Sequence, residues 1–174
     1  MKFSVADLLD QLSIDQSVSL ATLAKILKLS NKTDKAGLDL ASVALAKVGV
    51  LEILENGELQ RLQNEDLIDA RLRCSSKGFC FALRDDGGDD IYIRDHQLNH
   101  AWNGDRVLVR VTREGGRRRS PEGGVQCILE RATRSLLAQV MRQDDQLMAS
   151  PLDDRMLATI QPVSYTHLTL PTTD

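Results

Sequence analysis

Three of the chain's six Phe, Tyr and Trp residues fall in the short segment 77–93, which reads KGFCFALRDDGGDDIYI. Phe79 and Phe81 are two positions apart, so on a β-strand both rings point to the same face of a sheet. If the segment around Tyr92 pairs antiparallel with that strand, its ring can lie on that face as well. Exposed rings of this kind stack unpaired nucleic-acid bases. The pattern therefore predicts a platform for a single strand.

Basic side chains surround the rings. Residues 70–134 carry 13 Lys and Arg against 9 Asp and Glu, and 12 of the 13 are arginine, which pairs with phosphate and stacks on bases. Residues 1–69 carry 7 against 11, and residues 135–174 carry 2 against 5. We expect phosphate contacts from Lys77, Arg73, Arg84, Arg94, Arg106 and Arg110, and from the loop residues Arg117, Arg118 and Arg119.

The alternative interpretation places the rings in a hydrophobic core. The neighbouring residues Leu72, Cys80, Leu83, Ile91 and Ile93 are apolar and are expected to supply that core from the opposite face of the sheet. This favours the platform.

Residues 1–65 are predicted to form a winged helix-turn-helix. Apolar residues recur at helical spacing in three segments, with Ser4 and Ser19 as candidate N-caps. The third helix is expected over residues 35–47, burying Leu40, Val43 and Ala44. Asn56-Gly57 then predicts a two-stranded hairpin.

From residue 69 the hydrophobic period changes to two. Five short strands within residues 69–133 predict a small OB-type barrel, so the fold class is α+β. Residues 134–162 are expected to begin a second, truncated OB domain. The tail 163–174 carries no charged residue before Asp174 and is interpreted as foreign to the rest of the chain, with a native strand as the alternative.

Several motifs together resemble the ribonuclease II and ribonuclease R family of bacterial 3′-to-5′ exoribonucleases. These motifs are KGFCF, DIYIR, GDRVLVRV and ILER, and the resemblance covers about residues 1–162. It implies a first cold-shock (OB) domain preceded by the winged helix of the ribonuclease R branch, with Lys77, Phe79, Phe81 and Tyr92 at RNA-contacting positions. Arg94 and Asp95 depart from the family pattern, where a histidine and a further aromatic are usual.

The resemblance also implies a separate catalytic domain that this chain does not contain. That domain holds Mg²⁺ with clustered aspartates, so we expect no cofactor, no metal and no catalytic residue here. The acidic pairs of this chain lie in predicted turns, and the parent protein rather than this fragment is expected to hydrolyse RNA.

The cysteines and the hydropathy of the sequence indicate the cellular compartment and whether a membrane partner is expected. The three cysteines form no C-x-x-C pair, which argues against a disulfide framework or a zinc site and favours a reducing cytoplasm. No apolar segment approaches the roughly 20 residues of a membrane span, so no membrane partner is expected.

Three functions compete, and the lack of a carboxylate cluster argues against the third, a self-contained nuclease. The leading hypothesis is an RNA-binding region that guides single-stranded RNA to a catalytic domain. The alternative is a transcription regulator with a winged helix and an OB module, but the third helix has few groove-reading side chains, which argues against operator DNA.

Overall fold

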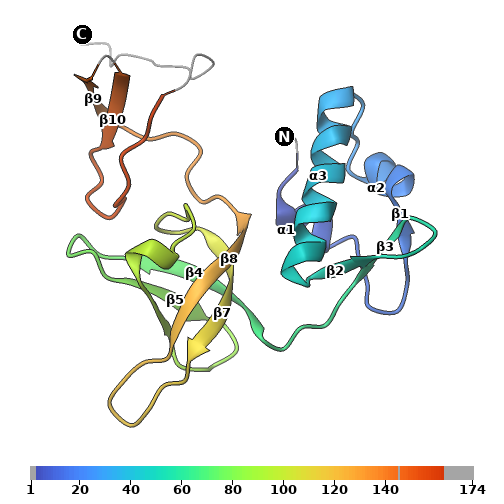
Figure 1. The fold of residues 1–174 in the computed structure, drawn as a ribbon, viewed down its shortest axis with the longest axis horizontal. Helices are drawn as coiled ribbons and strands as arrows, with labels where there is room; N and C mark the ends of the chain where they lie inside the picture. Colours follow the sequence, from blue (N-terminus) through green and yellow to red (C-terminus); the bar gives the residue numbers. More distant parts are fainter. Residues whose placement is uncertain (1–2, 145, 163–174) are drawn as a thin grey trace.

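The computed structural model describes residues 3–144 and 146–162. Figure 1 shows a helical N-terminal unit, a β-barrel, and a two-stranded hairpin in order along the chain. The tail 163–174, predicted to be foreign, lies outside the described residues.

The N-terminal unit contains the three expected helices, α1 (Val5–Leu9), α2 (Leu20–Ile26) and α3 (Lys32–Val48). Ser4 and Asp7 form a reciprocal capping box on α1, in which each side chain accepts the other's backbone N–H, at 3.0 and 2.7 Å. Ser19 caps α2, and Gly49 ends α3 in the left-handed region at φ 83°. None of the described helices is long and apolar enough to cross a membrane.

A small sheet covers the helices in the strand order β1-β3-β2. Its strands are β1 (Val18–Ser19), β2 (Leu51–Ile53) and β3 (Glu58–Arg61), with the predicted turn between β2 and β3. Leu8, Leu23, Leu38, Leu51 and Leu59 pack between helices and sheet and are almost fully buried.

The prediction for the buried face of α3 was wrong. Leu40 is 72% exposed, and Val43 and Ala44 are also exposed, whereas Leu38 and Leu45 are buried. Both sets have helical spacing, because α3 is rich in Ala and Leu on two sides. Periodicity alone could not choose between them.

The barrel contains the five expected strands, β4 (Leu67–Cys74), β5 (Cys80–Arg84), β6 (Ile91–Ile93), β7 (Arg106–Arg113) and β8 (Glu122–Glu130). It closes in the order β4-β5-β6-β8-β7, with β6 and β8 parallel and the other pairs antiparallel. This is an OB-type arrangement. Its interior is filled by Leu72, Ala82, Ile91, Ile93, Val107 and Val109. Leu83, which we assigned to the core, is only half-buried, because it has the same strand parity as Phe81.

The N-terminal unit packs against the outside of β7 and β8. Leu108 and Leu129 from these strands belong to the same hydrophobic cluster as the helix residues. The Arg110 Nη2 donates to the carbonyl of Val48 at 3.5 Å. One flank of the barrel is therefore covered and unavailable to a large ligand.

Beyond the barrel, β9 (Ala138–Gln143) and β10 (Gln146–Pro151) form an antiparallel hairpin. Ala149 also bridges to Ile160. The described residues after 133 close no second barrel.

The cysteine interpretation was wrong in one respect. Cys74 and Cys80 are opposite each other on β4 and β5 and form a disulfide inside the barrel. Sequence spacing did not reveal the pair, because the turn between them brings residues six positions apart into register. Because of this disulfide, the cysteines no longer support the expectation of a reducing compartment. Cys127 is free, and burial raises the pKa of its thiol.

Candidate nucleic-acid interface

Phe81 and Tyr92 form a pair of rings on the outside of the barrel. They are direct partners across β5 and β6, with ring centroids 5.5 Å apart and ring planes tilted by 54°. Their strand neighbours Cys80, Ala82 and Ile91 point inward and are buried, while both rings are half-buried. Neither ring is part of a buried core, so the core interpretation is wrong for these two residues.

The ring pair is the centre of a row that crosses four strands. Arg73 on β4 pairs with Phe81, and Glu122 on β8 pairs with Tyr92. Arg73 is exposed, so its guanidinium is available at one end of the row. The other end is occupied by a carboxylate.

Phe79 and Lys77 lie on the turn that precedes β5. Phe79 is 51% exposed and Lys77 is exposed. Gly78 between them has φ 81°, and no atom lies within 4 Å of the place a Cβ would take, so glycine here serves the turn conformation. The Cys74–Cys80 disulfide closes the base of this turn.

Three arginine side chains form ion pairs with Glu122, the β8 residue that pairs with Tyr92. Its Oε2 accepts from Arg94 at 2.8 Å, and its Oε1 lies 3.2 Å from Arg119 and 3.8 Å from Arg113. Glu122 is only 8% exposed. The sequence analysis missed it, because it follows Pro121 in a glycine-rich stretch that was interpreted as a loop.

A shallow groove of about 640 Å³ joins the rings to two of these arginines, Arg94 and Arg119. It is lined by Phe81, Tyr92, Arg94, His96, Arg118, Arg119, Ser120 and Glu122. The groove thus combines an apolar stacking surface with several cations. This is the combination that a base and its phosphate require.

Three predicted phosphate contacts lie elsewhere. Arg84 donates two hydrogen bonds to Asp86, at 2.8 and 2.6 Å, which lowers the pKa of that carboxyl to about 2. Arg106 donates to both oxygens of Asp69, and Arg110 lies against the N-terminal unit. None of the three lines the groove. Arg117 is exposed on the loop and also does not line it.

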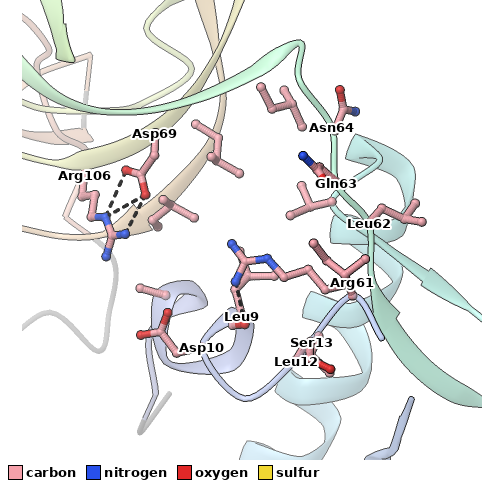
Figure 2. Close-up of a pocket in the computed structure, with 16 residues that line it drawn as sticks. Leu9, Asp10, Leu12, Ser13, Arg61, Leu62, Gln63, Asn64, Asp69 and Arg106 are labelled. Carbon is pink, nitrogen blue, oxygen red and sulfur yellow. Dashed lines mark hydrogen bonds and ion pairs between the residues drawn. The ribbon is translucent and has the colours of Figure 1, made fainter. Parts of the chain in front are cut away.

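A second pocket, of about 540 Å³, separates the N-terminal unit from the barrel (Figure 2). Arg106 faces Asp69 on one side, and the Arg61 Nη1 reaches the carbonyl of Leu9 at 2.8 Å on the other. The arginine heads are thus bound to groups of the protein itself. This pocket offers little to an anionic ligand.

Comparison with known proteins agrees with this architecture. Residues 70–128 match the family described as the ribonuclease B OB domain, and residues 6–62 match the cyanobacterial RNase R N-terminal domain. The chain belongs to the ribonuclease R family. The first match coincides with the barrel, and the second coincides with the helical N-terminal unit.

Two curated relatives match over most of this chain. The acetazolamide conferring resistance protein zam of Synechocystis is 48% identical over 162 residues, which are 92% of this chain and 21% of the relative. Ribonuclease R of Aquifex aeolicus is 30% identical over 132 residues, which are 76% of this chain and 18% of the relative. The chain therefore spans about a fifth of the length of these relatives.

Among solved structures, yeast Ssd1, a pseudonuclease, resembles the chain with a TM-score of 0.46 and 19% identity. The match covers 55% of this chain and 17% of the yeast chain.

Proposed function

We propose that this ribonuclease R-family chain binds single-stranded RNA and guides it to a catalytic domain elsewhere in the full-length protein. The observation that carries the proposal is the Phe81–Tyr92 pair, which lies outside the OB barrel beside an arginine-lined groove. Rings in this position stack bases without regard to sequence, and arginines bind the backbone. An exoribonuclease that degrades many RNAs needs such sequence-tolerant contacts.

The flanking parts have supporting roles in this proposal. We interpret the N-terminal unit, with its three helices and its small sheet, as a winged helix in which the β2–β3 hairpin would be the wing. We interpret the barrel as a cold-shock domain and the β9–β10 hairpin as the beginning of a second one.

Binding preference tests the proposal against a transcription regulator. We expect the chain to bind a 12-nucleotide single-stranded RNA more tightly than duplex DNA of the same length. The exposed side of α3 carries Leu40, Val43 and Ala44, whose side chains have no hydrogen-bonding group for base edges in a major groove. Equal or tighter binding of the duplex, measured at one salt concentration, contradicts the proposal.

The chain alone is expected to leave RNA intact in the presence of Mg²⁺ or Mn²⁺. Within residues 3–144 and 146–162, no group of three or more His, Cys, Asp or Glu residues is placed to hold a metal ion. End-labelled RNA incubated with the chain and resolved by size provides the measurement. A ladder of shortened products that survives repurification contradicts the expectation.

Replacing Arg117, Arg118 and Arg119 with serine is expected to flatten the salt dependence of RNA binding. Each phosphate contact contributes about 0.7 to the slope of log K against log salt for a single strand. Arg118 and Arg119 line the groove, so the slope should fall by about 1.4, or by about 2 if Arg117 also reaches the strand. The measurement is a salt titration on two unrelated oligonucleotides.

The loss should be similar for both oligonucleotides, because phosphate contacts carry no base information. The matched control is Arg155→Ser, which removes an exposed arginine that pairs with Asp153 after the β10 strand. A slope that is the same in the triple variant and in wild type shows that the loop does not contact RNA.

A further inference from the structure

Glu122 is placed so that arginines from three separate segments meet on one carboxylate. Arg94 follows β6, Arg113 ends β7, and Arg119 belongs to the loop before β8. The Glu122 side chain is 11% exposed, while those of Arg94 and Arg119 are 47% and 62% exposed. The anion therefore lies beneath the cations.

The backbone around Glu122 is fixed by both neighbouring strands. Tyr92 donates its N–H to the carbonyl of Pro121 at 2.8 Å, and the Thr112 hydroxyl donates to the carbonyl of Glu122 at 3.2 Å. At Gly123 a Cβ would lie 2.8 Å from the carbonyl oxygen of Arg110 and from an Ile91 methyl group. Only glycine allows β8 to lie this close, so the backbone that carries Glu122 has a fixed position relative to the rings.

We propose that Glu122 is a positioning residue that holds Arg94 and Arg119 as a phosphate clamp at one end of the Phe81–Tyr92 pair. The clamp would bind the phosphodiester of a nucleotide whose base stacks on the rings. This inference rests on the proposed function, because it takes the RNA-binding role of the groove as given.

The remaining hydrogen-bonding capacity of the arginines supports the clamp. Arg94 uses one Nη on Glu122, and Arg119 likewise approaches with one Nη. A guanidinium has five N–H donors, so each arginine keeps donors for a phosphate. Three arginines around one carboxylate also leave a net charge of +2, which favours an anion.

In this proposal, Glu122 contributes by holding the Arg94 and Arg119 side chains in the orientation that binds phosphate. An exposed arginine side chain loses considerable rotamer freedom when it binds a ligand, and a fixed partner removes part of that cost before binding. Without the carboxylate, Arg119 would depend on the loop alone for its position.

The test is a salt titration of the Glu122→Gln variant with a 12-nucleotide oligouridine. We expect weaker binding at low salt and a slope smaller by about 1.4, the contribution of two phosphate contacts. Between 50 and 200 mM salt, wild type should then lose about sevenfold more affinity than the variant. The matched control is Glu130→Gln, which removes the same charge from the exposed end of β8 and should leave the slope unchanged.

A double-mutant cycle separates positioning from a general effect of charge. In an Arg94→Gln, Arg119→Gln background, Glu122→Gln should add no further change, because it acts through those two arginines. A merely structural role would instead add its effect in both backgrounds. Thermal melting of each variant verifies that the barrel unfolds cooperatively.

Two outcomes overturn the clamp. If Glu122→Gln raises the affinity for RNA and the slope of the salt titration, the carboxylate competes with phosphate. If the slope is unchanged, Glu122 only holds the loop in place. If Glu122→Gln does not fold, the test uses the double variant Arg94→Gln, Arg119→Gln, which changes two exposed residues. An unchanged slope of the salt titration in this double variant rejects the clamp. Different results reject the proposed function itself. It is rejected if wild type does not bind RNA, or if alanine at Phe81 and Tyr92 does not change the affinity for RNA.

Discussion

Alanine at Phe81 or Tyr92 is expected to weaken the binding of single-stranded RNA by about 1 to 3 kcal/mol for each ring removed. The two rings lie next to each other at a centroid distance of 5.5 Å and are half-buried outside the barrel. A base that stacks on this pair loses its contact with one of the two rings when that ring is removed. Phe79→Ala, at an exposed turn position, is expected to fall within the same range.

The barrel should survive these changes. The loss of the ring–ring contact costs about 0.5 to 1.5 kcal/mol, which is less than the stability of a typical domain. Binding is measured by fluorescence anisotropy with a labelled oligonucleotide, and folding by thermal melting. Leu40→Ala on α3 is the control, because it removes an exposed apolar side chain far along the sequence from the groove.

If Phe81→Ala or Tyr92→Ala abolishes the cooperative melting transition, the barrel needs the rings for its stability and the platform is rejected. If melting is retained and affinity for RNA is unchanged, the rings are exposed but bind no bases.

Asp105→Ala is expected to lower the free energy of unfolding by about 3 kcal/mol. Asp105 is fully buried, and its carboxylate accepts from the backbone N–H groups of Trp102 and Ala132 at 2.8 and 3.0 Å and from Arg131 at 2.8 Å. Alanine removes the acceptor of both N–H groups and leaves Arg131 without its carboxylate partner. The loss falls at the point where the chain enters β7 and leaves β8.

Urea unfolding of wild type and variant gives this difference directly. The control is Asp69→Asn, which breaks another Asp–Arg pair on the same barrel, but one whose side chains are 45% and 38% exposed. That pair is expected to contribute less than about 1 kcal/mol. Equal effects of the two substitutions would show that burial of Asp105 is not what makes it important.

Local signals in the sequence predicted much of the fold. The caps at Ser4 and Ser19 and the turn at Gly57 depend on only a few neighbouring residues. The five barrel strands followed from alternation in the same way, and the alternation placed Phe81 and Tyr92 on one face. For these features, the local chemistry and the final structure agree.

The remaining features depend on packing between distant segments. The covered flank of the barrel removed Arg110 from the set of exposed cations, and nothing in its neighbours along the chain indicates this. The buried side of α3 is determined by what packs against it rather than by its own periodicity. Glu122 became recognisable only when β6 and β8 were seen to pair in parallel.

The central claim is that single-stranded RNA lies across the rings and the arginine groove. Mapping of backbone amide chemical shifts during titration with a 12-nucleotide oligouridine tests it most directly. We expect the largest changes at Arg73, Phe81, Tyr92, Arg94 and Arg119, and no change along the exposed side of α3 at Leu40 and Val43. Changes concentrated on α3, with the ring residues unaffected, contradict the claim and place the nucleic-acid site on the helical unit.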